Sequence, residues 1–403
     1  MKDSEILYDV LIFLVAAVVV VPAFRRLRTS PVLGYLAAGI LVGPHGLAVI
    51  RDSESAHTLA EFGVVFLLFM IGLEFSAERL RALGHYVFGL GALQVTVTGC
   101  LIGGVAWALG ATEEAAIIIG GGLALSSTAF VLQLLIERGE RATSFGNISF
   151  AVLLFQDLAI VPLLMLVSLL GEGEGTFITA MGMAVVGISM VLGAFLAGIL
   201  LSETEYRHQV EADIRPFRGI LLGLFFMSVG MSIDIALIWS ELAQITLLVI
   251  GLMVGKSIVT AALCRGFGLP VSVSVRVGLL LSQGGEFGFI LFLTASTLGL
   301  LAAETTQILL ASVALTMVAT PLMAYAGSQF SSFWARHEKV SVAGVEQIGE
   351  DLHDHVLIAG FGRVGQTVAK MLSAGGISYA ALDLDANRPL MARTAHNRAS
   401  TSF

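Results

Sequence analysis

Asp157 is the residue with the clearest potential for chemistry, because it interrupts a strongly apolar stretch. It stands in Leu153-Leu154-Phe155-Gln156-Asp157-Leu158-Ala159, in the middle of an apolar run over residues 146–170. At the centre of a membrane-spanning helix, a carboxylate costs roughly 3 kcal/mol or more. Protonation, a bound cation or a buried lysine lowers that cost. A carboxyl group that trades a proton for a cation is the minimal part of a cation/proton exchanger; a hydrogen bond between helices is the structural alternative.

Two further apolar runs are interrupted by small and polar residues, which predicts discontinuous helices. Gly120-Gly121-Gly122 and Ser126-Ser127-Thr128 interrupt residues 114–136, and Ser282-Gln283-Gly284-Gly285-Glu286 interrupts residues 272–300. Such breaks expose backbone carbonyls and half-helix dipoles beside an ion site. One break in each half of the chain is typical of inverted-repeat transporters. Close helix packing through small residues is the alternative.

Lys256 is the only lysine inside an apolar run. It lies in Met253-Val254-Gly255-Lys256-Ser257, eight residues from the end of its run, which is too deep for its head to reach the membrane surface easily. A buried ammonium requires a partner. Asp157 and Glu286 are the predicted charge partners.

The composition indicates a polytopic membrane protein. The chain of 403 residues is 56% hydrophobic and 13% charged, whereas soluble domains carry about 25% charged residues. Its two cysteines both lie in apolar segments, so no disulfide framework is predicted. Eleven runs are long enough to span a membrane, about 17–25 residues each: 6–24, 31–50, 59–76, 84–109, 114–136, 146–170, 177–201, 218–235, 241–264, 272–300 and 305–326.

The arginines predict the orientation of these spans. With the N-terminus outside, the outer segments carry only Lys2 and Arg51, and the remaining loop arginines face the cytoplasm, where basic residues concentrate. An odd number of spans then places the C-terminal tail in the cytoplasm. The cytoplasmic set is Arg25, Arg26, Arg28, Arg79, Arg81, Arg138, Arg141, Arg207, Arg215, Arg218 and Arg265.

A change of composition after residue 326 predicts a second kind of domain. Residues 1–326 form the transmembrane domain, and the polar residues 327–354 form a linker. A short strand at 355–359, a helix near 366–374 and a second strand at 379–382 then predict one βαβ unit. Since the chain stops at residue 403, we expect residues 355–403 to be a truncated Rossmann-like segment.

The glycines between the first strand and the helix predict a dinucleotide site. Gly360, Gly362 and Gly365 form a GxGxxG pattern, and Asp383 follows the second strand, 18 residues after the last glycine. Such glycines allow a tight turn and the close approach of a diphosphate to the helix N-terminus. The acid would accept hydrogen bonds from the ribose hydroxyls.

These patterns resemble those of Kef-type glutathione-gated potassium efflux systems, within the monovalent cation:proton antiporter-2 family. The resemblance covers residues 6 to 390. It rests on Gly34-Tyr35-Leu36-Ala37-Ala38-Gly39, Phe69-Met70-Ile71-Gly72-Leu73-Glu74, Leu125-Ser126-Ser127-Thr128-Ala129, Phe155-Gln156-Asp157, Gly193-Ala194-Phe195-Leu196-Ala197-Gly198 and Phe225-Phe226-Met227-Ser228-Val229-Gly230-Met231.

The resemblance implies a fold and an ion site. The fold would be an all-α polytopic membrane protein, an inverted-repeat, sodium/proton-antiporter-like bundle with two discontinuous crossing helices. Asp157 would exchange cation and proton, with Gln156 in the place where sodium exchangers often carry a second aspartate. Ser127 and Thr128 would belong to one unwound helix and Glu286 to the other.

The resemblance also implies regulation by a cytosolic domain. His208, Glu211 and Asp213 resemble an acidic regulatory loop that contacts a nucleotide domain of the RCK or TrkA-N type. That domain would begin at His355 and bind NAD(H) or AMP. Homodimers, glutathione and an ancillary regulatory protein are implied partners, and the bacterial inner membrane is the implied location. No cofactor for transport, metal beyond the transported cation, catalytic residue or nucleic acid is expected.

One departure from the family concerns the junction of Val186 and Gly187. Compared with the family, which usually has about 13 spans, we expect roughly 60 residues to be absent from the chain there; the fused span 177–201 would preserve the downstream topology. The predicted function is exchange of potassium for protons, and the chain is not expected to be an enzyme. The alternatives are a sodium/proton antiporter, a non-transporting remnant, a nucleotide-gated potassium channel, which would need a carbonyl-lined filter not evident in the sequence, and a membrane-bound NAD oxidoreductase.

Overall fold

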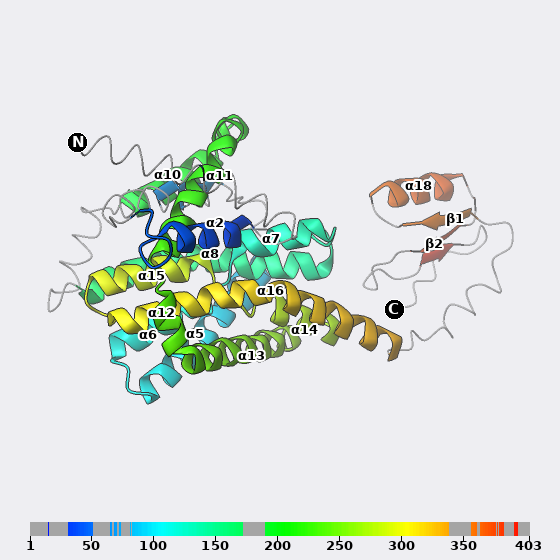
Figure 1. Ribbon diagram of the computed structural model, residues 1–403. Helices are drawn as coiled ribbons and strands as arrows, with labels where there is room; N and C mark the ends of the chain where they lie inside the picture. Colours follow the sequence, from blue (N-terminus) through cyan, green and yellow to red (C-terminus); the bar gives the residue numbers. More distant parts are fainter. Residues whose placement is uncertain are drawn as a thin grey trace. The chain divides into compact units, whose positions relative to one another are not determined.

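The structure is a computed structural model in two compact units, Met1–Phe333 and Trp334–Phe403, which are described separately (Figure 1). It describes residues 15, 31–50, 65–66, 68–70, 72–73, 81, 83–171, 190–337, 356–360, 363–375, 377, 379–382 and 391–393. The predicted span 6–24, most of 59–76 and the junction at residues 186–187 lie outside the described residues.

The larger unit is a bundle of helices. Its described elements are α2 (Pro31–Val42), the π-helical turn η1 (His85–Gly91) leading into α5 (Ala92–Ala108), α6 (Glu113–Ala124), α7 (Thr128–Glu137), α8 (Ser144–Gly171), α10 (Met190–Ser202), α11 (Arg207–Met231), α12 (Ile235–Ser240), α13 (Leu242–Gly266), α14 (Val271–Leu280), α15 (Glu286–Thr297) and α16 (Ala303–His337).

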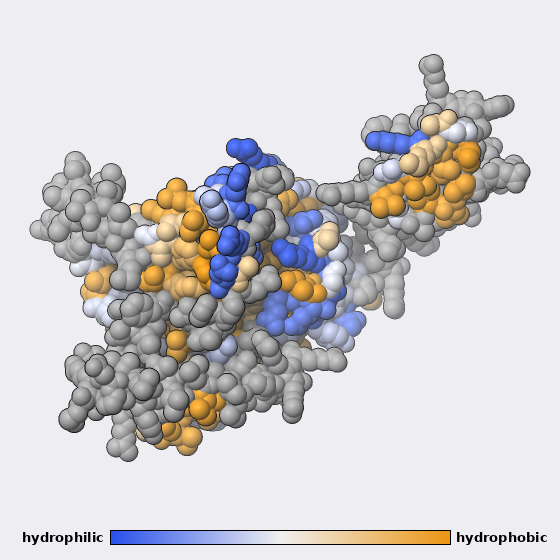
Figure 2. Space-filling model, turned by 90° about the horizontal axis from the view of Figure 1, so that it is seen from above, coloured by the Kyte–Doolittle hydropathy of each residue, from blue (hydrophilic) through white to orange (hydrophobic). Residues whose placement is uncertain are grey.

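Five helical stretches among the described residues are long and apolar enough to cross a membrane. They are His85–Ala108, Glu113–Glu137, Ser144–Gly171, Leu242–Gly266 and Ala303–Ser331, and each coincides with a predicted span. Three of the other predicted runs contain shorter apolar helices, and the run 218–235 overlaps the end of the 25-residue α11. Figure 2 shows hydrophobic residues over much of the coloured surface of this unit, as lipid contact requires. The prediction of an all-helical membrane domain is confirmed.

Close contacts between backbones hold pairs of these helices together. A Cβ on Gly39 of α2 would lie 2.0 Å from the carbonyl oxygen of Met227 in α11. A Cβ on Gly120 of α6 would lie 2.3 Å from the oxygen of Gly99 in α5. Helices in lipid associate through such small residues, because lipid tails are as apolar as the side chains. A buried cluster that includes Phe226, Phe287 and Phe292 fills the space around the two broken helices.

The smaller unit contains the predicted βαβ arrangement. Strand β1 (Val356–Ala359) pairs in parallel with β2 (Tyr379–Leu382), and α18 (Arg363–Ala374) connects them. A third strand, β3 (Met391–Arg393), pairs antiparallel with β2, giving the order β1-β2-β3. The sequence did not predict β3.

Candidate functional site

Two helix breaks meet in the larger unit, as the sequence predicted. The first, Leu125–Ser127, separates α6 from α7, and the second, Leu281–Gly285, separates α14 from α15. Ser126 Oγ donates a 2.9 Å hydrogen bond to the carbonyl oxygen of Leu281, which joins the breaks. A Cβ on Gly285 would lie 2.7 Å from the carbonyl carbon of Ser126, so the backbones touch. Breaks of this kind are tolerated at membrane depth only inside protein.

The position of the first break corrects one expectation. Gly120, Gly121 and Gly122 remain within α6, and the helix ends two residues later. Two of these glycines pack closely against side chains of other helices. A Cβ on Gly122 would lie 2.5 Å from the ring of Phe292, and one on Gly121 would lie 2.8 Å from the side chain of Leu163. Close packing therefore explains the triplet, and the break belongs to the residues after it.

Asp157 lies at the N-terminus of the half-helix α7. Its side chain on α8 is buried, 7% exposed, and Thr128 Oγ1 donates a 2.8 Å hydrogen bond to its Oδ1. Ser127, fully buried, caps α7 by accepting a bond from the N–H of Phe130 at 3.2 Å. The positive end of a helix dipole stabilises a carboxylate placed there. The structure thus brings Asp157 together with Ser127 and Thr128.

Lys256 lies among backbone carbonyls of both breaks. Its Nζ donates to the oxygens of Leu123 at 3.0 Å, Leu125 at 2.7 Å and Gln283 at 2.7 Å. These three bonds use the three hydrogens of the ammonium. The hydrogen bonds of the ammonium thus go to backbone carbonyls, and a charge interaction with Asp157 or Glu286 stays a prediction. The ammonium also neutralises the carbonyl-bearing, negative ends of the interrupted helices.

Gln156 spans from α8 to the first break. Its Oε1 accepts a 2.7 Å hydrogen bond from the N–H of Ser126, and its Nε2 donates at 2.6 Å to Gln94 Oε1. Gln94, on α5, is fully buried and was missed by the sequence analysis. An amide within an apolar run, one turn before Thr98, was the available signal. Through these two hydrogen bonds, Gln156 supports the backbone of the first break.

Hydroxyl groups of α16 support the second break. Thr316 Oγ1 accepts a 3.0 Å hydrogen bond from the N–H of Gly284, and Thr320 Oγ1 donates at 2.8 Å to Gln283 Oε1. Both threonines are fully buried, and the sequence analysis missed them. Glu286, also buried, is the first residue of α15, where the helix dipole favours an acid.

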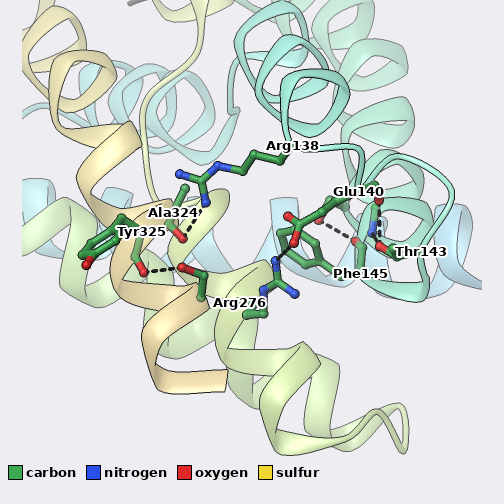
Figure 3. Close-up of polar contacts among 10 residues, drawn as sticks. Arg138, Glu140, Thr143, Phe145, Arg276, Ala324 and Tyr325 are labelled. Atoms are coloured by element: carbon green, nitrogen blue, oxygen red, sulfur yellow. Dashed lines mark hydrogen bonds and ion pairs between the residues drawn. The ribbon is translucent and has the colours of Figure 1, made fainter. Parts of the chain in front are cut away.

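A polar cluster anchors the other end of α14. Arg276 Nη2 lies 2.6 Å from Glu140 Oε1, and its guanidinium lies 4.1 Å from the ring centre of Phe145. Arg138 donates a 3.1 Å hydrogen bond to the carbonyl oxygen of Ala324 (Figure 3). These contacts connect α14 and α16 to the α7–α8 turn. They therefore link the broken helix α6–α7 to the broken helix α14–α15.

The predicted regulatory residues lie in a helix. His208, Glu211 and Asp213 fall in the first turns of α11, so the expectation of a loop there is wrong. The segment contains Gln209, Glu211 and Ala212, which favour helix, and has no glycine to end it before residue 219. The structure therefore places these residues on α11.

Two of the predicted nucleotide-site residues can be located. Gly360 follows β1 with φ of +94°, a conformation that side chains disfavour. A Cβ on Gly365 would lie 2.1 Å from the carbonyl oxygen of Gly360, so α18 packs against the end of the strand. Gly362 and Asp383 lie outside the described residues. Among the described residues, no group of three or more His, Cys, Asp or Glu side chains is arranged to hold a metal.

Comparison with protein families decides the class of protein. The model for the sodium/hydrogen exchanger transmembrane family matches residues 12–186 and 175–325. The chain belongs to this family. The chain is thus a multi-pass membrane protein, and the family to which it belongs is one of transporters and not of enzymes. The two matched segments meet around residues 175–186, close to the junction where the sequence analysis places missing residues.

Curated relatives of the chain include two from Arabidopsis thaliana. K(+) efflux antiporter 1, chloroplastic, is 43% identical over 453 residues, covering 98% of this chain and 38% of the relative. K(+) efflux antiporter 2, chloroplastic, is 42% identical, covering 98% and 39%. The chain thus spans about two fifths of the length of these relatives. Each alignment is longer than the 403 residues of the chain, so it includes residues that only the relatives carry.

A solved structure shares the fold of this chain. It is that of the sodium proton antiporter MjNhaP1 from Methanocaldococcus jannaschii, with a TM-score of 0.63 and 14% sequence identity. The match covers 82% of this chain and 100% of that one. The antiporter-like architecture with two broken helices expected from the sequence is therefore confirmed at the level of the fold.

Proposed function

We propose that the protein exchanges a monovalent cation, potassium, for protons, and that Asp157 carries both. The observation that carries this proposal is the buried carboxylate of Asp157 at the N-terminus of α7, bonded to the Thr128 hydroxyl at 2.8 Å. A carboxylate at this depth needs a counterion or a proton. Either one satisfies it, and the two compete for the same oxygens.

The breaks supply further oxygens for a partly dehydrated cation. Thr128 Oγ1 has lone pairs beside Asp157, and the Ser126 peptide lies in the break between α6 and α7. Lys256 Nζ already donates hydrogen bonds to the carbonyls of Leu123, Leu125 and Gln283. These three oxygens therefore do not compete with Asp157 for the cation. In one facing state Asp157 is ionised and holds the cation; in the other it is protonated. A core bundle moves against a dimer scaffold between these states.

The relatives support potassium over sodium. The two curated relatives, more than 40% identical over nearly the whole chain, are potassium efflux antiporters by name. The sodium proton antiporter with the same fold is 14% identical, a level at which only the fold is shared. We therefore propose the potassium form, with sodium/proton exchange as the competing specificity.

Regulation by nucleotide is a second part of the proposal. We divide the chain into an exchanger domain at residues 1–326, a linker at 327–354 and an RCK-type segment at 355–403. The parallel β1–α18–β2 unit and the positive φ of Gly360 support a site for NAD(H) or AMP built from Gly360, Gly362, Gly365 and Asp383.

The proposed partners follow the Kef-type resemblance. His208, Glu211 and Asp213 of α11 would be the regulatory residues of a homodimer, with glutathione and an ancillary protein as regulators. We place the protein in a bacterial inner membrane, with its N-terminus outside and its C-terminus in the cytoplasm. The excess of arginines on the predicted inner loops supports this orientation.

Proton movement in proteoliposomes tests the proposed exchange. The protein is reconstituted into vesicles with an acidic interior and a trapped pH dye; potassium and then sodium are added outside. Potassium is expected to dissipate the gradient at lower concentration than sodium. A greater response to sodium would reassign the specificity.

Two results in the same vesicles would overturn the proposal. A folded, dimeric protein that responds to neither cation would be a non-transporting remnant, consistent with the residues it lacks relative to its relatives. A potassium current that needs no proton gradient would indicate a channel.

A further inference from the structure

Gln94 and Gln156 together replace two of the backbone hydrogen bonds lost where α6 ends. In an uninterrupted helix, the carbonyl of Ala124 would accept from residue 128, and the N–H of Ser126 would donate to residue 122. Here Gln94 Nε2 donates to the carbonyl of Ala124 at 3.2 Å, and Gln156 Oε1 accepts from the N–H of Ser126 at 2.7 Å. The 2.6 Å bond from Gln156 Nε2 to Gln94 Oε1 joins the two amides.

The backbone fixes the direction of this chain of hydrogen bonds. At one end the carbonyl of Ala124 can only accept, so it requires the NH2 of Gln94. At the other end the N–H of Ser126 can only donate, so it requires the oxygen of Gln156. Flipping either amide would place two acceptors or two donors face to face. Both side chains are fully buried, so water is not at hand to correct such a mismatch.

A carboxylate at position 156 does not fit this chain. It could accept from the N–H of Ser126, but its other oxygen would face Gln94 Oε1, another acceptor. Rotating the Gln94 amide would present NH2 to the carboxylate and turn its oxygen toward the carbonyl of Ala124. Either arrangement leaves two acceptors in contact inside the protein, which is strongly unfavourable.

We propose that Gln94 is a positioning residue for the cation site. Through Gln156 it sets the place of the Ser126 peptide, and with it the oxygens beside Asp157, and it makes an uncharged amide obligatory at position 156. The effect on cation affinity rests on the proposed exchange function. The requirement for an amide rests on the hydrogen bonds alone.

The variants Gln94→Leu and Gln94→Glu separate positioning from simple packing. Gln244, an exposed glutamine of α13, supplies the controls Gln244→Leu and Gln244→Glu. In proteoliposomes, Gln94→Leu is expected to raise the half-saturating potassium concentration at least about fivefold, with a smaller change in maximal rate, because the break shifts by losing its support. The control leaves both values unchanged. An unchanged half-saturating concentration in Gln94→Leu, with only lower thermal stability, would overturn the positioning role.

The melting temperature of Gln94→Glu in detergent gives a readout that needs no transport. While protonated, the introduced carboxyl can donate to Ala124 and accept from Gln156, as the amide does. Once ionised it cannot donate. The difference in melting temperature between parent and Gln94→Glu is therefore expected to grow as pH rises, and not to grow for Gln244→Glu. A constant difference would contradict the directional chain.

A paired exchange tests the requirement for an amide. Gln156→Glu alone is expected to lower the melting temperature sharply. Adding Gln94→Lys places an ammonium that can donate to both the carboxylate and the carbonyl of Ala124, and part of the loss is expected to return. If Gln156→Glu alone is as stable as the parent, the requirement for an amide at position 156 is excluded. If the parent is stable but exchanges no cation, the proposed function fails while these melting results still decide the amide requirement.

Discussion

Ser126 Oγ and the carbonyl oxygen of Leu281 lie 2.9 Å apart and form a hydrogen bond between residues separated by 155 positions in the chain. This bond joins the two helix breaks at their centre. Because a carbonyl released from its helix has no water to bond at this depth, the serine hydroxyl takes the place of the missing N–H. The two halves of the larger unit are thus connected where the cation is proposed to bind.

Removal of the Ser126 hydroxyl is expected to weaken the contact between the two helix breaks, called here the crossing. Ser126→Ala leaves the carbonyl of Leu281 without its donor, at a cost of about 1–3 kcal/mol. A lower melting temperature in detergent is the measurement. Ser168→Ala is the control, since exposed Ser168 bonds only to its own helix at Leu164. Equal melting temperatures for the two variants would show that the crossing does not depend on this bond.

A methyl group at Gly285 is expected to separate the breaks. The Cβ of Gly285→Ala would lie 2.7 Å from the carbonyl carbon of Ser126 and 2.8 Å from its oxygen. Neither backbone can move without shifting its break, so we expect a loss of about 1–3 kcal/mol in stability and no measurable exchange. Gly255→Ala on α13 meets nothing within 4 Å and should behave as the parent. Normal exchange by Gly285→Ala would contradict the close approach.

Lys256 is expected to act through carbonyls more than through Asp157. Lys256→Met leaves three buried carbonyl groups without their hydrogen-bond donor and should reduce the free energy of unfolding by at least about 3 kcal/mol. Most of that loss is expected to persist when Asp157→Asn is also present, because the carbonyls remain unpaired. Thermal unfolding of the single and double variants measures this, with exposed Lys370→Met as the control. Full recovery in the double variant would instead identify Asp157 as the essential partner.

The sequence predicted the parts of this site that depend on side-chain type alone. Asp157 and Lys256 are conspicuous because a charge in an apolar run is costly wherever it lies. Both breaks were predicted as well, since small and hydroxyl residues interrupt helices that are otherwise continuous. The hydrogen-bond acceptors of Lys256 could not be predicted, because they are backbone carbonyls that become available only where the helices end.

The remaining errors have a related cause. Gly120–Gly122 suggested the break, yet glycine serves equally for close packing, and only the neighbouring α5 and Phe292 reveal which applies. Gln94, Thr316 and Thr320 are ordinary residues of apolar helices in the sequence. They acquire a role only because α5 and α16 pack against the breaks. Such contacts depend on the tertiary fold, which a local pattern does not specify.

Cation binding is expected to stabilise the protein in a manner that depends on pH. A ligand that binds only the folded state raises the free energy of unfolding by RT ln(1 + [L]/Kd). Since protons compete for Asp157, potassium should raise the melting temperature more at high pH than at low pH. The shift should vanish in Asp157→Asn at every pH. A potassium-dependent shift that persists in Asp157→Asn would place the cation elsewhere.

Exchange by Asp157→Asn tests the central claim most directly. The parent, Asp157→Asn and the control Glu113→Gln, an exposed acid in the first turn of α6, are reconstituted at equal amounts with an acidic interior, and potassium is added outside. The account predicts that the parent and Glu113→Gln dissipate the pH gradient and that Asp157→Asn, although folded, does not. Potassium-driven proton movement by Asp157→Asn at the parental rate would show that another group carries the proton.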